Sequence, residues 1–320
     1  MKYFQFFFFL IAINACSVGN DQNKIDEEVD GSEKKPAAYS LDGNALYPPE
    51  LAPETLARLT ANLDSARQNY EADSTDEMNI IWYGRRLAYL SLYPEAIEVF
   101  SKGLELHPKS FKLYRHRGHR YISTRQFDKA IDDLEKAAWF IAGEELMIEP
   151  DGAPNKLNIP LSTTQFNVYY HLALAHYLKR DYRKAINTYL ECMKVSDNND
   201  LLVATTDWLY MSYRKIRRDI DAKKLLDAIS ADMEIIENES YLNRLLMYKG
   251  TKTPEELLQV AGDQEDNGVT IATQGYGVGN WYLINGDREK AKEIFTQVVS
   301  GTSWSAFGFI AAEAELRRMK

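Results

Sequence analysis

The sequence predicts an all-α protein, built as a right-handed solenoid of about six helical hairpins. Two observations indicate this: a 34-residue pattern recurs along the chain, and within it small residues alternate with aromatic or aliphatic ones at helical spacing. The 320 residues are 45% hydrophobic and 27% charged, which is enough apolar content to bury a core.

The repeat is clearest where residues 77–110 align with residues 111–144. The aligned pairs, each 34 residues apart, are Gly84 with Gly118, Leu87 with Tyr121, Tyr93 with Phe127, Ala96 with Ala130, Ile97 with Ile131, Phe100 with Leu134 and Gly103 with Ala137. We expect the small residues where two helices cross closely, with the larger side chains filling the space around them.

The same register continues along the chain from Ala130 to Ala185, Ala222 and Ala291. The predicted repeats lie near 77–110, 111–144, 166–199, 203–235, 236–265 and 272–303, with a leading helix near 54–70 and a closing helix near 303–318. An insertion at 143–164 is rich in Pro and Gly, and is therefore a loop on one face of the array. It is either functional or a family peculiarity.

This pattern resembles the tetratricopeptide repeat (TPR) superfamily over roughly residues 54–318. Tyr114–Tyr121, residues 158–163 and Gly275–Trp281 resemble a set of exported bacterial TPR lipoproteins. The resemblance implies a protein-interaction scaffold that needs no cofactor and is not an enzyme. An export signal followed by a TPR array also resembles periplasmic lipoproteins that act as adaptors for proteases and cell-wall hydrolases.

The first 15 residues read as a signal peptide. An apolar run from Phe4 to Ile13 is too short to span a bilayer, and it ends in Ile13-Asn14-Ala15-Cys16, which resembles a lipobox. We therefore expect lipid on Cys16 and a lipoprotein of the bacterial cell envelope, on the outer membrane. The alternative is ordinary cleavage after Ala15.

Residues 16–53 are acidic, rich in Pro and Gly, and poor in apolar residues, so we expect a flexible tether there. The folded array then begins at residue 54. The acidic stretch from Asp26 to Glu33 is long enough to compete for a basic groove on the same chain.

Several kinds of chemistry are disfavoured. A net charge of −9 argues against nucleic acid as a partner, and two cysteines cannot build a disulfide scaffold or a zinc site. No nucleophile elbow, P-loop or zinc-protease motif is present. We interpret the glycines of Gly275–Gly279 as close helix packing and Cys192 as a small buried thiol.

A basic, aromatic surface is predicted on the first helices of the early repeats, the helices that line the concave groove in TPR arrays. Residues 82–120 hold eight Lys or Arg and three acids. The candidate binding residues are Trp82, Arg85, Tyr89, Lys112, Arg115, His116, His119, Tyr170 and His171. Asn167, Asp207, Trp208, Met211 and Arg214 continue the same face. Arginine forks and aromatic rings suit an anionic peptide, whose binding should weaken with salt and strengthen as the imidazoles gain charge near pH 6.5.

An alternative reading makes Arg115, His116 and His119 an acid–base or small-anion site beside the insertion. A metal site among the histidines is disfavoured, because neighbouring arginines repel a cation. His176 shares the register of Tyr121, so we expect it in the core.

Overall fold

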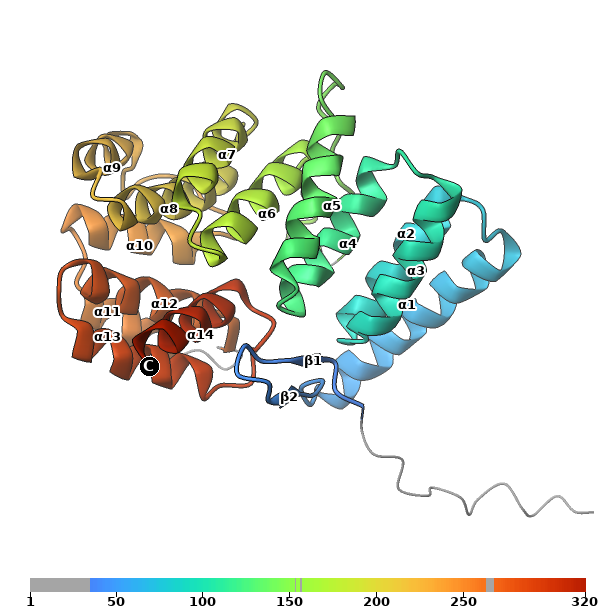
Figure 1. The fold of residues 1–320 in the computed structure, drawn as a ribbon, viewed down its shortest axis with the longest axis horizontal. Helices are drawn as coiled ribbons and strands as arrows, with labels where there is room; N and C mark the ends of the chain where they lie inside the picture. Colours follow the sequence, from blue (N-terminus) through green and yellow to red (C-terminus); the bar gives the residue numbers. More distant parts are fainter. Residues whose placement is uncertain (1–34, 153, 156, 263–267) are drawn as a thin grey trace, which may run out of the picture. The chain divides into compact units, whose positions relative to one another are not determined.

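The computed structural model describes residues 35–152, 154–155, 157–262 and 268–320. Over these residues nearly all regular secondary structure is helical, which confirms the predicted fold class (Figure 1). No helix within these ranges is long and apolar enough to cross a bilayer. The elements are β1 (Ala38–Tyr39), β2 (Ala45–Leu46), α1 (Pro53–Ala72), α2 (Glu77–Tyr89), α3 (Tyr93–Leu106), α4 (Phe111–Ser123), α5 (Phe127–Phe140), α6 (Thr164–Leu178), α7 (Tyr182–Lys194), α8 (Asn199–Lys215), α9 (Asp219–Leu225), the 3₁₀ turn η1 (Leu226–Ala228), α10 (Glu239–Lys249), α11 (Pro254–Gly262), α12 (Gly268–Ile284), α13 (Arg288–Val299) and α14 (Phe307–Met319).

Consecutive helices pair as antiparallel hairpins, and each hairpin packs against the next, from α2–α3 to α12–α13 (Figure 1). Helix α1 precedes the first hairpin, and α14 packs on the last one. Each predicted repeat range overlaps one of these hairpins, and α6, α8 and α12 begin two to four residues before the predicted starts at 166, 203 and 272. The described part of the insertion has no helix and only one isolated bridge, between Ile148 and Thr163.

The turns inside the hairpins reproduce the repeat register. Ser91, Arg125, Arg180 and Arg217 adopt left-handed backbone conformations with φ between 59° and 66°, and Gly250 and Gly286 have φ of 82° and 98°. Each follows the first helix of a hairpin, and the next residue donates a backbone hydrogen bond to the carbonyl five positions earlier, as in the Schellman motif. Only two of these six turns use glycine, so tight hairpin packing stabilises a conformation that costs other residues about 1–2 kcal/mol.

Small residues lie at the helix crossings, as their spacing predicts. A Cβ added at Gly118 would lie 2.7 Å from Cγ of Leu134, and one at Gly279 would lie 2.6 Å from a ring carbon of Phe295. Ala130 and Cys192 are fully buried. Burial also raises the pKa of the Cys192 thiol to about 12, which keeps it protonated. The glycines of Gly275–Gly279 therefore serve helix packing.

The predicted tether extends too far along the chain. Residues 16–34 of that prediction lie outside the described residues, but residues 38–46 form a short antiparallel hairpin instead of a flexible segment. Ala37 and Ala38 are buried, and the indole of Trp304 donates to the carbonyl of Tyr47 at 2.7 Å. The segment is ordered by the burial of these two alanines and by hydrogen bonds to residues such as Trp304, although its composition alone predicts disorder.

A buried ion pair joins this hairpin to the repeats. Arg125, in the α4–α5 turn, contacts the carboxylate of Glu313 on α14 at 2.9 Å, with the two side chains 3% and 10% exposed. The other carboxylate oxygen of Glu313 accepts from the backbone N–H of Leu41 at 2.5 Å. The guanidinium of Arg125 also donates to the carbonyls of Ser123 and Trp304. Segments far apart in the sequence are thus bonded at one point.

The groove face closes in the later repeats, contrary to the sequence-based expectation. Helices α10 and α12 pack against α8, so Asp207, Trp208 and Met211 are at most 1% exposed instead of lining a groove. Asp207 forms an ion pair with Arg244 of α10, and both side chains are fully buried. Burial raises the pKa of Asp207 to about 6 even though the guanidinium of Arg244 opposes this shift.

Candidate functional site

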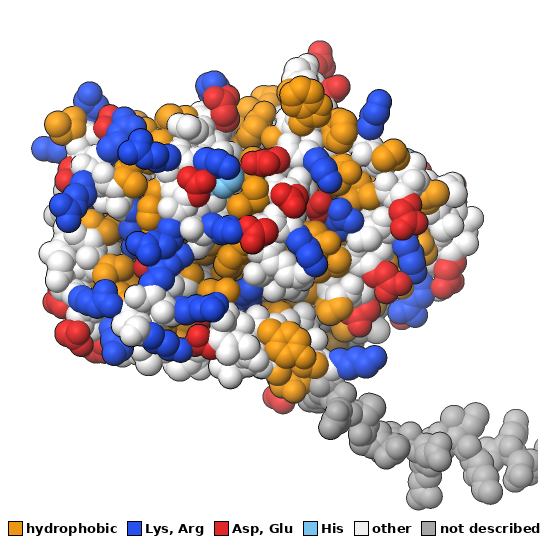
Figure 2. All heavy atoms as spheres, in the orientation of Figure 1, with side chains coloured by type: hydrophobic (Ala, Val, Ile, Leu, Met, Phe, Trp, Pro, Cys, Tyr) orange, Lys and Arg blue, Asp and Glu red, His pale blue; other side chains and the backbone are white. Residues whose placement is uncertain are grey.

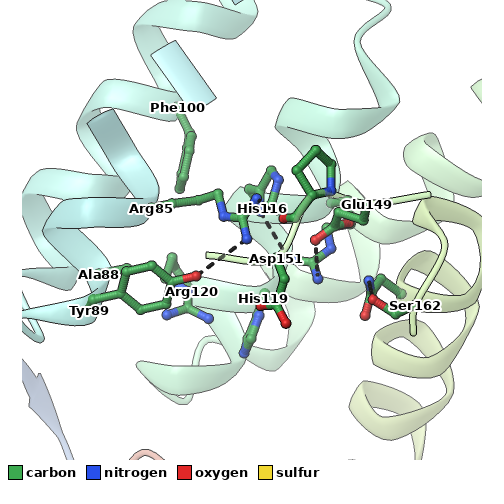
Figure 3. A pocket seen from close by; sticks show the side chains of 13 residues that line it. Arg85, Ala88, Tyr89, Phe100, His116, His119, Arg120, Glu149, Asp151 and Ser162 are labelled. Carbon is green, nitrogen blue, oxygen red and sulfur yellow. Dashed lines mark hydrogen bonds and ion pairs between the residues drawn. The ribbon is translucent and has the colours of Figure 1, made fainter. Parts of the chain in front are cut away.

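The earlier repeats keep this face accessible. Arg85 and Tyr89 of α2 line a cavity of about 200 Å³ together with Arg115 and His116 of α4, a residue of α6 and the insertion. Figure 3 shows Arg85, Tyr89 and His116 converging on it. Its lining residues are Arg85, Ala88, Tyr89, Phe100, Arg115, His116, His119, Arg120, Glu149, Pro150, Asp151, Ser162 and Asn167. Trp82 is not part of this lining, and its ring packs 4.4 Å from the guanidinium of Arg85.

The insertion lies directly on this surface. Arg85 donates to the carbonyl oxygen of Pro150 at 2.8 Å, and Arg86 donates to that of Gly152 at 2.9 Å. A Cβ at Gly152 would lie 2.8 Å from Cζ of Tyr89, so the loop backbone touches the groove as closely as a glycine allows. The insertion is thus a ligand-like strand held in the groove of its own chain.

Two further contacts anchor the insertion at its base. Thr163 caps α6 by accepting from the N–H of Phe166, and the N–H of Glu149 donates to the carbonyl of Ser162 at 3.0 Å. The side chain of Gln165 bonds the backbone of Met147 and Glu145. These bonds fix the approach of Glu149 to the groove.

Glu149 contributes the anionic group. Its carboxylate lies 2.9 Å from a guanidinium nitrogen of Arg115, and both side chains are 9% exposed. Burial lowers the pKa of Arg115 to about 10, and the Glu149 carboxylate counteracts that shift. A desolvated, charge-assisted pair of this kind fixes position strongly, because removing either partner leaves a buried charge unpaired.

The imidazoles of the site are neutral. Burial lowers the pKa values of His116 and His119 well below the usual 6.5, and the positive charges of Arg115 and Arg120 lower them further. Arg115 donates to Nδ1 of His116 at 3.0 Å, which makes that nitrogen an acceptor. The expectation that anion binding strengthens near pH 6.5 assumed unperturbed imidazoles, whereas the lowered pKa values favour their neutral forms at that pH.

Two candidate residues lie in the core instead of the cavity. The hydroxyl of Tyr170 bonds that of Tyr241 at 3.0 Å, and the ring is buried. His171 is buried, donates from Nδ1 to the carbonyl of Asn167, and packs 4.3 Å from the ring of His119. The closing helix α14 adds Phe307 to this ring cluster, a contact that no local sequence pattern indicates. His176 is buried, as its register predicts.

A second, more apolar cavity of about 370 Å³ shares Arg85, His116, Glu149 and Pro150 with the first. Lys112 lines it, together with Met78 and Ile81 of the early helices and Met147 and Ile148 of the insertion.

Sequence reasoning missed Glu149 and Arg120 as site residues. Glu149 belongs to a loop whose destination depends on contacts with helices far away in the sequence. Arg120 is one turn beyond His116, so helical spacing places it on the same face. Arg120 enters the sequence-based prediction only as part of the local excess of basic residues.

On the face drawn in Figure 2, side chains of both charges are present, and basic ones are more frequent toward the left. Within the described ranges, no group of three His, Cys, Asp or Glu side chains is placed to hold a metal ion.

Comparison with known families identifies the repeat. The family model described as "Tetratricopeptide repeat" matches residues 166–199, which contain the hairpin α6–α7. Residues 166–199 are therefore a tetratricopeptide repeat. The other TPR hairpins share its register of turns and small residues.

Among curated proteins, the chain is similar to the BBSome complex member BBS4 of Bos taurus. The two are 28% identical over 133 residues, which is 42% of this chain and 21% of that protein, so the matched region spans about a fifth of the relative.

Similar solved structures include YrrB, titled a TPR protein with an unusual peptide-binding site, at 14% identity and a TM-score of 0.43. That match covers 74% of this chain and 92% of YrrB. A TPR protein from Parabacteroides merdae matches at 12% identity and a TM-score of 0.46, over 81% of this chain and 94% of the other.

Proposed function

We propose that this TPR protein is a non-enzymatic adaptor that holds an anionic, extended segment of a partner protein on the groove face of α2 and α4. TPR arrays are protein-interaction scaffolds whose stacked repeats create an extended binding surface. The observation that carries the proposal is the docked insertion: the groove already binds an extended acidic strand, through Arg115 and the arginines of α2.

A partner segment binds by exchanging with residues 149–152. Its acidic side chain takes the place of Glu149 on Arg115, and a neighbouring apolar side chain enters the cavity lined by Met78 and Ile81. Charge-assisted hydrogen bonds contribute about 1.5–3 kcal/mol each, so a few of them with one buried side chain support micromolar binding. The covalently attached loop competes at a high effective concentration, which keeps the groove closed to weaker ligands.

Partner capture after crosslinking in cells tests this function. Arg115→Glu combined with Lys112→Glu should abolish capture, and Glu149→Ala should increase it because the internal competitor is weakened. The matched control reverses two exposed charges on second helices, Lys129→Glu with Lys184→Glu, and should capture as wild type does. A folded groove variant that keeps its partner as tightly as wild type would remove the groove from the mechanism.

We further propose that lipid on Cys16 tethers the protein to the bacterial envelope. The support is the apolar run Phe4–Ile13 followed by the lipobox-like Ile13–Cys16, which lie outside the described residues. Cys16→Ser should move the protein from the membrane fraction to the soluble one, with mass spectrometry reporting the modified N-terminus. An unmodified mature chain that starts elsewhere contradicts the tether.

A further inference from the structure

The cavity beneath the docked insertion contains a cation without a counter-ion. Arg120 projects from α4 into the space between Arg85, Tyr89 and His119 (Figure 3). Among the described residues, no side chain or carbonyl accepts a hydrogen bond from its guanidinium, and no carboxylate pairs with it. The ring of Tyr93, 5.2 Å away, is its nearest favourable contact. Arg120 is only partly exposed, and its partial burial lowers the pKa of its guanidinium.

The charge balance of the lining points to one missing negative charge. Three arginines face two carboxylates, Glu149 and Asp151, and the imidazoles of His116 and His119 are neutral. Glu149 is already committed to Arg115. A monoanion therefore neutralises the cavity, whereas a dianion such as phosphate overcompensates it beside Asp151.

The size of the cavity limits what can enter. With the insertion docked, about 200 Å³ remains, the volume of roughly six or seven water molecules. The bonds from Arg85 and Arg86 to the loop carbonyls hold a strand of the insertion across the groove. A passing polypeptide does not fit unless that strand leaves, but a small organic acid fits with the loop in place.

We propose that this cavity is a binding site for a small free monocarboxylate, with Arg120 as its counter-ion and the insertion as its cap. The carboxylate accepts from the guanidinium of Arg120, and the amide of Asn167 and the hydroxyls of Ser162 and Tyr89 lie along the walls for further hydrogen bonds. The site overlaps the proposed partner groove at Arg85 and Arg115, and the two ligands exclude each other because the site exists only while residues 149–152 are docked.

Titration of the purified full chain tests the site. The probes are acetate, lactate and butyrate, each compared with its neutral primary amide. Binding is measured by thermal shift and by NMR of the backbone amides of α4 and the insertion. The acids should raise the melting temperature and saturate at millimolar concentration, and the amides should do neither. Arg120→Gln should weaken binding about tenfold or more, since one charge-assisted interaction is lost. Arg183→Gln, at an exposed position on α7, should bind as wild type does.

Several results overturn the proposal. Equal binding of acid and amide removes the charge requirement, and unchanged binding by Arg120→Gln removes the residue. Arg120→Lys keeps the charge without the guanidinium fork. With both variants folded, Arg120→Lys should bind the acids more weakly than wild type and more tightly than Arg120→Gln. If acidic peptides bind and no small acid does, the capped site is wrong and the partner groove stands. Binding of small acids without capture of any partner would support the capped site alone.

Discussion

The groove face of the repeat borders cavities in the first half of the array and is buried in the second half. In α2, α4 and α6 it borders two cavities and is covered by a loop through a few polar contacts. In α8 it is covered by α10 and α12 and becomes core, with the ion pair of Asp207 and Arg244 fully enclosed. Position within a repeat therefore does not decide whether a residue can bind a ligand. What packs on that face decides it.

The largest difference between the halves should appear when one member of each ion pair is removed. Asp207→Ala leaves Arg244 as an unpaired charge without access to water, which should cost about 3–5 kcal/mol in the free energy of unfolding. Glu149→Ala should cost about 1–3 kcal/mol, because Arg115 borders a cavity that water can enter. Urea unfolding measures both.

A double replacement provides the control. Asp207→Leu with Arg244→Met removes both charges together and should be much less destabilising than Asp207→Ala alone. Equal losses for Asp207→Ala and Glu149→Ala would show that the two environments do not differ as described.

Glycine-to-alanine substitutions compare how tightly each half of the array is packed. A Cβ at Gly277 would lie 2.6 Å from Cδ of Arg244 inside a fixed helix pair, so Gly277→Ala should cost about 1–3 kcal/mol. The equally crowded Gly152 is in the loop, which can move away from Tyr89. Gly152→Ala should therefore change stability by less than about 0.5 kcal/mol and instead speed hydrogen exchange of residues 149–152. A large loss of stability in Gly152→Ala would mean that the insertion is part of the core.

A pH effect should belong to the first half alone, because all five histidines precede α8. His116 and His171 are buried with pKa values well below 6.5, so below that pH the unfolded chain binds more protons than the folded one. Stability should fall as pH decreases from about 6.5, by about 1.4 kcal/mol per pH unit for each such histidine. His116→Gln should reduce this slope. Affinity of the groove for acids should not rise over the same range, and an increase would show that these imidazoles charge within the fold.

Sequence reasoning could predict the helices because the signals are local. Small residues such as Gly118 and Ala130, and the partners they contact, recur within one hairpin or its neighbour. The groove residues of α2 and α4 follow from the same register. Two outcomes depended on contacts distant in sequence: the docking of Glu149 on Arg115, and the burial of Asp207 by Arg244.

The order of residues 38–46 escaped prediction for the same reason. Their partners, Trp304 and Glu313, lie more than 250 residues away along the chain. Composition describes what a segment can bury by itself, and this hairpin is stabilised by a surface that another part of the chain supplies.

The bond of Glu313 to both Arg125 and Leu41 has a consequence for how the chain folds. In an open solenoid each repeat touches only its neighbours, so folding can begin anywhere and a terminal repeat can unravel alone. Here the backbone of Leu41 meets Glu313 across 272 positions of sequence. Such a contact forms only after much of the chain is in place, which slows the final step of folding. The same contact couples the short hairpin at residues 38–46 to α14, so unfolding should resemble a single cooperative transition more than the stepwise fraying of a linear array.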